Sequence, residues 1–141
     1  MAGYSATPLA KKLGVREDAL LLIEGAPPGF EALLAPLPAG VEVVTKAPRT
    51  REIDVAIAFL SAATKLDPTI TRIRARLAQN GGLWIAWPKK ASKVQTDVTE
   101  DRVRDVGLAQ GLVDNKVCAI DEVWSGLRLV IRVKDRRPNA R

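Results

Sequence analysis

Three short stretches of this sequence are almost entirely apolar instead of alternating with polar residues: residues 19–24 (ALLLIE), 53–60 (IDVAIAFL) and 82–87 (GLWIAW). A strand with one wet face alternates, so an uninterrupted run of this length indicates a strand covered on both faces. The third run carries Trp84 and Trp87, which the alternation of a strand directs to opposite faces of the sheet. These runs therefore predict a central sheet with helices above and below it.

Helix patterns separate the apolar runs. They cover residues 7–14, 28–35, 67–80 and 97–112. In the first helix, Thr7 is a suitable N-cap, and Gly14 can adopt the left-handed conformation that ends a helix. In the third helix, Asp67 is a suitable N-cap, and the proline after it suits the first helical position. In the fourth, Asp97 and a glutamate three positions on form a start similar to a capping box. Helices therefore connect successive strands.

The end of the chain predicts a β-hairpin. Residues 115–124 and 127–133 form its arms around Ser125 and Gly126, and residues 41–45 (VEVVT) form a further short strand. Strand, helix and strand in succession indicate a parallel sheet with right-handed crossovers. We predict a single Rossmann-like α/β domain over residues 1–134. It is a three-layer sandwich with a mainly parallel six-stranded sheet of order 2-1-3-4-6-5, strand 6 being antiparallel. Residues 135–141 are predicted to be a disordered basic tail.

Composition and charge narrow the classes of protein. The chain has 141 residues, of which 47% are hydrophobic and 27% charged, as in globular domains. The longest apolar run is too short to span a bilayer and the start lacks the apolar core of a secretory signal, so a cytoplasmic protein without a membrane role is predicted. The net charge of +6 favours anionic partners, but the basic residues are scattered. Arg72 and Arg76 share a helix face without a groove-reading motif, which favours a solvated face over nucleic-acid binding.

The sequence contains no histidine and a single cysteine, Cys118. Without histidine there is no Ser-His-Asp or Cys-His arrangement and no histidine-containing metal site. We expect no metal; a magnesium site made only of carboxylates stays open, although no clustered acidic motif supports it. Cys118 lies in a strand-like run, which favours a buried and inert thiol. Whether the chain catalyses a reaction is left open.

The turn after the first apolar run, EGAPPGF at residues 24–30, bears on cofactor binding. Folds that bind dinucleotides or S-adenosylmethionine place a glycine-rich loop here, because ligand and backbone must approach closely. Pro27 and Pro28 have no amide hydrogens, so donors at the helix start are depleted. The turn therefore predicts no cofactor, with S-adenosylmethionine as the alternative. Glu24 could bind a ribose or an amine, but a carboxylate capping the following turn is favoured.

A second candidate site follows the third apolar run. Lys89 and Lys90 stand at the carboxyl end of a central strand, where open α/β sheets bind ligands, and Ser92 adds a hydroxyl. Asp121, from the end of strand 5, could face the same cleft. These residues predict an anion-binding corner, against the simpler interpretations of a solvated loop and an ion pair.

Trp124 and Ser125 lie at the predicted hairpin tip. An exposed indole is costly unless it packs or binds something. Two interpretations stay open: a lid packed on the sheet edge, which is favoured, and a contact with a partner.

Two resemblances follow from these residues. The order of elements resembles the class I methyltransferase fold, which also ends in an antiparallel hairpin after a Gly-Gly strand such as NGGLWIAW (80–87). The segments YSATPLAKKLG (4–14), WPKKAS (87–92) and CAIDEVWSGL (118–127) are similar to those of a small bacterial family of domains of unknown function. The resemblance implies the fold and transfers no catalytic residue.

Taken together, the residues predict a non-catalytic binding or interaction module that uses the Lys89, Lys90, Ser92 and Asp121 corner. Its partner would be a small anionic ligand or a protein. The alternative is a small S-adenosylmethionine-dependent methyltransferase, or a nucleotide-binding enzyme with an atypical first loop. The oligomeric state is left open, because a short strand at the sheet edge could pair with a second copy.

Overall fold

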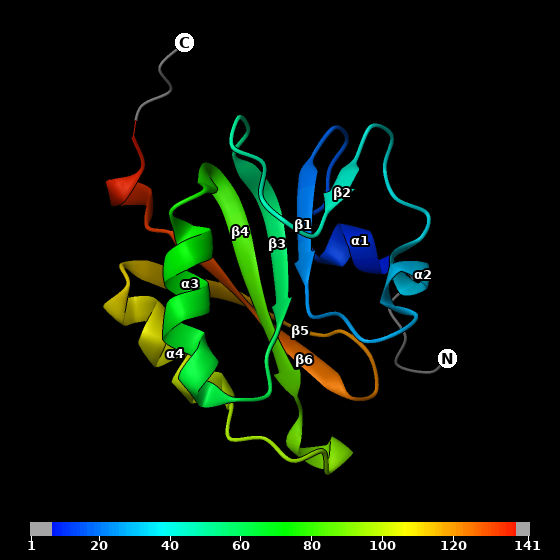
Figure 1. The fold of residues 1–141 in the computed structure, drawn as a ribbon, viewed down its shortest axis with the longest axis vertical. Coiled ribbons are helices and arrows are strands. Elements are labelled where there is room, and N and C mark those ends of the chain that lie inside the picture. The colour runs from blue at the N-terminus through cyan, green and yellow to red at the C-terminus, as the bar shows by residue number, and fades with distance from the viewer. Residues whose placement is uncertain (1–6, 138–141) are drawn as a thin grey trace.

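A six-stranded sheet forms the middle layer of the computed structural model, which describes residues 7–137 (Figure 1). Its strands in chain order are β1 (Leu20–Glu24), β2 (Glu42–Val44), β3 (Ile53–Phe59), β4 (Leu77–Pro88), β5 (Leu112–Ala119) and β6 (Trp124–Ile131). The order across the sheet is β2-β1-β3-β4-β6-β5; β1 to β4 are parallel, and β6 is antiparallel to β4 and β5. The predicted fold class, strand order and antiparallel strand are confirmed.

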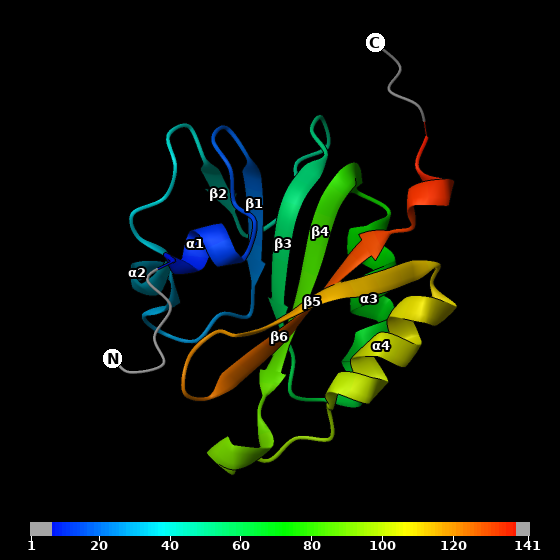
Figure 2. The ribbon, with the colours of Figure 1, turned by 180° about the vertical axis from the view of Figure 1, so that it is seen from behind.

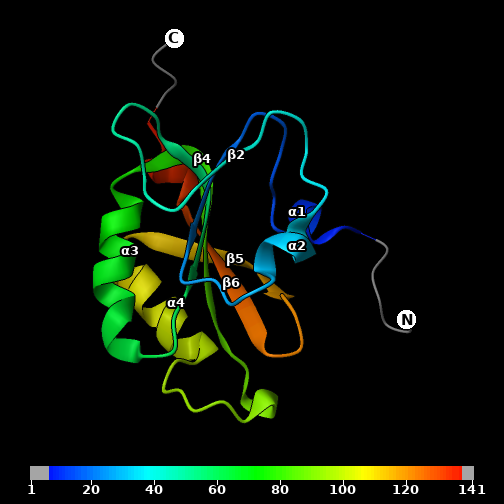
Figure 3. The ribbon, with the colours of Figure 1, turned by 45° about the vertical axis from the view of Figure 1, so that its right-hand side comes forward.

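Helices cover both faces of this sheet. They are α1 (Leu9–Lys12), α2 (Phe30–Leu34), α3 (Leu66–Arg74) and α4 (Glu100–Ala109). Figure 3 shows α3 and α4 on one side of the sheet and α1 and α2 on the other. Seen from behind, α1 and α2 lie at the β1 and β2 end of the sheet, while the outer part of the β5–β6 hairpin has no helix on this side (Figure 2). The layers explain why the central strands are apolar without alternation.

Each face of the sheet has its own apolar core. Trp87 packs in the core under α3 and α4 with Leu83 and Ile85, whereas Trp84 packs in the core under α1 and α2. Trp87 is 6% and Trp84 0% exposed, and their packing in different cores confirms that they lie on opposite faces. The indole nitrogen of Trp84 also donates a 2.8 Å hydrogen bond to the carbonyl of Leu13, just after α1. Strand β4 therefore holds the end of α1 through a buried polar contact.

The helix predicted over residues 67–80 is wrong at both ends. Helix α3 begins at Leu66, after a 3-10 turn over residues 63–65, and ends at Arg74. Residues 77–80 open β4 instead, where Leu77 pairs with Ile53. Gly81 does not stop a helix but lies within this strand. Glycine is needed there, because a Cβ would stand 2.8 Å from the carbonyl oxygen of Asp54. Strand pairing has overridden the local helical spacing.

Two other helix starts differ from the prediction. Helix α1 has Pro8 at its N-cap position, one residue after Thr7, although Gly14 is left-handed with φ 85° as expected. Helix α4 is capped by Thr99, whose hydroxyl accepts a 3.2 Å hydrogen bond from the amide of Arg102. Asp97 accepts instead from the amide of Ala63 at 2.7 Å. The carboxylate therefore ties two loops together rather than capping the helix.

The hairpin turn is also displaced from the predicted position. Strand β5 ends at Ala119 and β6 begins at Trp124, so Ser125 and Gly126 lie inside β6 and the turn covers residues 120–123. One oxygen of Asp121 accepts hydrogen bonds from the amides of Val123 at 2.8 Å and Trp124 at 2.7 Å. This side-chain turn, and not the Ser-Gly pair, reverses the chain.

The C-terminal residues that are described contact the sheet. Residues 133–135 form a 3-10 turn, the side chain of Arg136 donates to the carbonyl of Ile131 at 3.0 Å, and the amide of Arg137 donates to Gln79 at 2.8 Å. Residues 135–137 of the predicted tail therefore contact the rest of the domain, and residues 138–141 lie outside the described residues. Over residues 7–137, no helix is long and apolar enough to cross a membrane.

Candidate functional site

The carboxyl edge of the parallel strands is the place where this fold can hold a ligand. Strands β1, β3 and β4 end side by side there, at the lower end of the sheet in Figure 1. The chain goes from β1 to β2 on one side and returns to β3 on the other, so the strand order reverses at β1. Open α/β sheets bind ligands in the crevice at such a switch point.

The turn from β1 to α2 has left-handed glycines near both ends. Gly25 has φ 69° and Gly29 has φ 85°. A Cβ on Gly25 would lie 3.0 Å from the carbonyl oxygen of Phe59, whereas a Cβ on Gly29 would meet nothing within 4 Å. Gly25 thus lets the turn pass close to the end of β3, and Gly29 opens the five-residue α2. The amide of Phe30 is already used, because it donates to the carbonyl of Pro27 at 3.2 Å.

Glu24, the last residue of β1, is bound by an arginine of α3. The two guanidinium nitrogens of Arg72 donate to its two carboxylate oxygens at 2.7 and 2.9 Å. This hydrogen bond is the main reason why the pKa of Arg72 is raised. The side chains are 24% and 58% exposed, so the pair is reachable from solvent. Glu24 therefore binds α3 rather than capping the following turn.

The predicted solvated helix face is thus partly engaged with the protein. Besides the Arg72 ion pair, the guanidinium of Arg76 donates to the carbonyl of Pro48, in the connection between β2 and β3. Arg72 thus fastens α3 to the end of β1, and Arg76, two residues after α3, fastens the connection to β4 to the loop after β2.

Three aromatic rings pack at the same edge on the α1 and α2 side. Phe30 and Phe59 lie with ring centroids 4.8 Å apart at 74°, and Phe59 and Trp124 lie 5.1 Å apart at 86°. These edge-to-face contacts are favourable beyond the area that they bury. Trp124 is half-buried against this core, which is the geometry of a lid. Ser125 lies inside β6, paired with Trp87 and Ala119.

The fold brings the predicted lysine corner together through its backbone. The amide of Lys89 donates to the carbonyl of Val123 at 2.7 Å, so the loop after β4 lies against the turn that contains Asp121. The side chain of Ser92, however, donates to the carbonyl of Lys89 at 2.7 Å and accepts from the amide of Val94 at 3.2 Å. One oxygen of Asp121 likewise holds its own turn. Lys90 is exposed and Lys89 half-buried, so the lysines are the groups left to meet a ligand.

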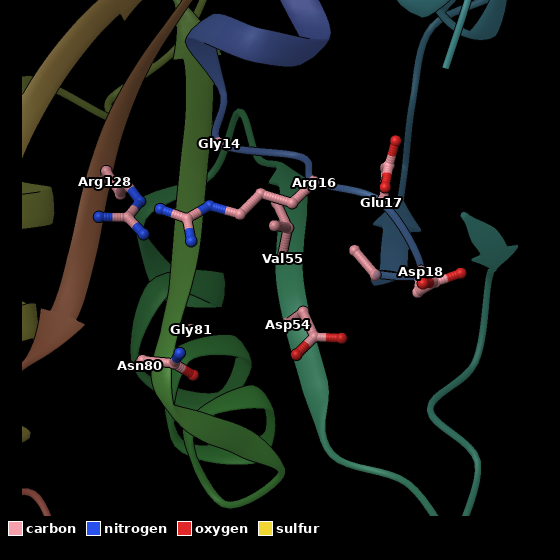
Figure 4. Close-up of a pocket in the computed structure, with 10 residues that line it drawn as sticks. Gly14, Arg16, Glu17, Asp18, Asp54, Val55, Asn80, Gly81 and Arg128 are labelled. Carbon is pink, nitrogen blue, oxygen red and sulfur yellow. The ribbon is translucent and has the colours of Figure 1, made fainter. Parts of the chain in front are cut away.

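A cavity of about 370 Å³ lies at the opposite, amino edge of the sheet, on the α1 and α2 side (Figure 4). Arg16, Asp54, Asn80 and Arg128 contribute to its wall. None of these residues stood out in the sequence. The sequence offered no signal for this cavity, because only the strand register, in which Arg128 pairs with Trp84, places the guanidinium over Gly82.

Cys118 and the acidic residues offer little reactive chemistry. Cys118 is 8% exposed, and burial raises the pKa of its thiol. Over the residues that the structure describes, no three histidine, cysteine, aspartate or glutamate side chains gather closely enough to hold a metal ion.

Solved structures share this fold. A methyltransferase dependent on S-adenosylmethionine from Aquifex aeolicus has a TM-score of 0.59 and 15% identity, with 88% of each chain covered. A type 11 methyltransferase from Sulfolobus solfataricus, described as putative, has a TM-score of 0.63 and 9% identity, with 94% of this chain and 95% of that chain covered. LepI in complex with S-adenosylmethionine has a TM-score of 0.52 and 12% identity; 89% of this chain and 47% of LepI are covered, about half of LepI's length.

No protein-family model matches the sequence, and no curated protein matches it. At identities of 9–15% the structural likeness concerns the fold. The chain therefore has a Rossmann-like fold of the methyltransferase kind, and its ligand has to be argued from its own residues.

Proposed function

We propose that the carboxyl edge between β1 and β3 binds S-adenosylmethionine and that the domain is a small methyltransferase. The observation that carries this proposal is the strand order, which reverses at β1. Open α/β sheets bind ligands at such a switch point, and the methyltransferase neighbours share this fold. The sequence favoured a non-catalytic module without a cofactor and gave a methyltransferase as the alternative. We prefer the methyltransferase, because the similarity to methyltransferase folds covers almost the whole chain.

The residues of the first turn separate two kinds of cofactor. Dinucleotides carry a pyrophosphate and need a cradle of backbone donors, which Pro27 and Pro28 deplete. S-adenosylmethionine has no phosphate and bears a sulfonium and an ammonium group, so its needs are different. A carboxylate such as Glu24, at the strand end, suits an amine or the ribose hydroxyls. The prolines therefore disfavour a nucleotide while leaving the adenosyl ligand compatible with the turn.

Glu24 and the backbone of residues 25–29 would hold the ligand, with Gly25 keeping the turn close to β3. Glu24 would have to share or exchange its partner Arg72, whose side chain is 58% exposed and can move away into solvent. When bound, S-adenosylmethionine supplies an electrophilic methyl group. The role of this chain's residues is then to bind and orient the ligand, because Cys118 is a buried thiol whose pKa is raised.

The test is ligand binding, measured by calorimetry and by thermal unfolding with S-adenosylhomocysteine and S-adenosylmethionine. One-site binding at 100 times the Kd adds about 2.7 kcal/mol to the free energy of unfolding. The Glu24→Gln variant should bind more weakly by about tenfold, since it loses a charged acceptor. Glu122→Gln is the matched control, because Glu122 is an exposed carboxylate in the β5–β6 turn. No stabilisation by either ligand would contradict the proposal.

A second candidate is a non-catalytic module that binds an anion at Lys89 and Lys90. It is favoured by the hydrogen bond that seats Lys89 against the β5–β6 turn and by the exposure of Lys90. The Lys89→Ala, Lys90→Ala double variant should then lose stabilisation by inorganic phosphate and keep its fold. This candidate would be ruled out if phosphate stabilised the double variant as much as the wild type, while S-adenosylhomocysteine stabilised the wild type.

A further inference from the structure

Two arginines face each other across the cavity at the amino edge of the sheet. Arg16 lies in the connection between α1 and β1, and Arg128 lies in β6; both line the cavity of about 370 Å³. Figure 4 shows the side chain of Arg16 crossing in front of β4 toward the guanidinium of Arg128.

Strand β4 is shaped to accommodate Arg128. Between the apolar parts of this strand, Gly82 has no side chain, and a Cβ there would lie 2.7 Å from the Cζ atom of Arg128 and still closer to its Nε. The guanidinium therefore lies directly over the backbone of Gly82. Arg128 pairs with Trp84 in the ladder, so the register holds its Cα in place as well. The arginine occupies a built position and is not a free surface side chain.

The charges of this pair are not neutralised by the protein. Within residues 7–137, neither guanidinium forms an ion pair or a hydrogen bond. Arg51, Arg72 and Arg104, by contrast, all pair with carboxylates. Arg128 is half-buried, and its burial is the main cause that lowers its pKa, followed by the charges of Arg136 and Arg16. Because arginine keeps its proton at ordinary pH, the repulsion persists unless an anion enters.

The carboxylates around the cavity do not serve as that anion. Asp54 accepts a 2.8 Å hydrogen bond from the amide of Leu20 and lies 3.6 Å from a guanidinium nitrogen of Arg51. In Figure 4 the carboxylates of Glu17 and Asp18 lie on the side of the cavity away from Arg128. The region between the two arginines is therefore positive.

We propose that Arg16 and Arg128 bind an oxyanion, a carboxylate or phosphate group, of a small polar molecule at the amino edge of the sheet. Two guanidinium forks present paired donors that match the geometry of an oxyanion. The amide side chain of Asn80 lies in the same wall and can add a hydrogen bond to the rest of the molecule. The cavity volume falls within the range of small-molecule sites. This site is at the opposite edge from the turn at Gly25 and does not depend on the proposed function.

The test is a titration of the whole chain with inorganic phosphate and with citrate, against sodium chloride at equal ionic strength. Thermal unfolding and amide chemical shifts are measured in parallel. We expect stabilisation by both anions, with the largest shifts at Asn80 and Gly81. The Arg16→Gln variant should bind about tenfold more weakly or worse, as expected when a charge-assisted contact is lost. Because Arg16 is exposed, this variant should fold normally.

Two more variants sharpen the test. Gly82→Ala keeps both arginines but drives a Cβ into the guanidinium of Arg128, so it should lose binding as well. If Gly82→Ala does not fold, the comparison of Arg16→Gln with the wild type is enough to decide whether the two arginines bind the anion. The Lys46→Ala, Lys65→Ala variant is the matched control, because it removes two exposed positive charges outside both candidate sites, and it should bind phosphate as the wild type does.

Three results would overturn the proposal. One is an equal response of wild type and Arg16→Gln to both anions. Another is that the shifts appear at residues 89–92 and vanish in the Lys89→Ala, Lys90→Ala variant, which would assign the anion to the lysine corner instead. The third is that single-stranded oligonucleotides bind with an affinity that grows with their length while phosphate and citrate do not bind, which would indicate a nucleic-acid surface.

Discussion

Replacement of Trp84 by phenylalanine should destabilise the domain through two separable losses. The indole is 0% exposed and donates to the carbonyl of Leu13 at 2.8 Å. Without the donor, this carbonyl loses its buried partner at a cost of about 1–3 kcal/mol. The smaller ring also leaves unfilled space in the core, at about 1 kcal/mol for the apolar atoms removed. The Trp84→Phe variant should therefore lose about 2–4 kcal/mol of unfolding free energy in urea, measured by far-UV circular dichroism.

Trp87→Phe is the matched control for this experiment. Trp87 is 6% exposed on the other face of the same strand, and within residues 7–137 its indole nitrogen makes no hydrogen bond. It should lose only the packing part, about 1 kcal/mol. Because Trp84 holds the end of α1, amides at Lys12 and Leu13 should exchange faster in Trp84→Phe alone. Equal destabilisation by the two substitutions, with unchanged exchange in α1, would refute the role assigned to the hydrogen bond.

Three other predictions can be checked on the same protein. Gly25→Ala should cost about 2–3 kcal/mol in urea and Gly29→Ala about 1, because both positions are left-handed but only the first Cβ meets a backbone oxygen. Thr99→Ala should cost about 1 kcal/mol, since α4 loses its cap. Burial raises the pKa of Cys118, so a disulfide reagent should react slowly at pH 8. The thiol's contribution to stability should be complete below pH 9.0 and lost as pH rises through the folded value, a loss absent in Cys118→Ala.

The strand order was predictable because it follows from local patterns and a general rule of handedness. Continuous apolar runs mark doubly covered strands, and right-handed crossovers leave few ways to connect them. Element ends were less predictable. Leu77 follows Ile70 and Ile73 at helical spacing, yet it opens β4 because Ile53 offers a strand partner. Pairing over 24 residues of separation outweighed a weak local preference.

The lysine corner illustrates a second limit. Lys89 and the turn at Asp121 do come together, but the side chains of Ser92 and Asp121 form hydrogen bonds within their own loops. Serine and aspartate commonly form such local turns, so this outcome could have been weighed from the sequence. What could not be weighed is the pairing of Glu24 with Arg72, which lies 48 residues further along the chain.

The sequence by itself determined the layered sheet, its strand order and the opposite directions of Trp84 and Trp87, because burial imposes a period that neighbouring residues display. Only the tertiary structure decided which charges are neutralised: Glu24 meets Arg72, while Arg16 and Arg128 face each other without a carboxylate between them. The physical reason is that electrostatic energy depends on distance and exposure in space, and neither quantity is encoded in the spacing of residues along a chain.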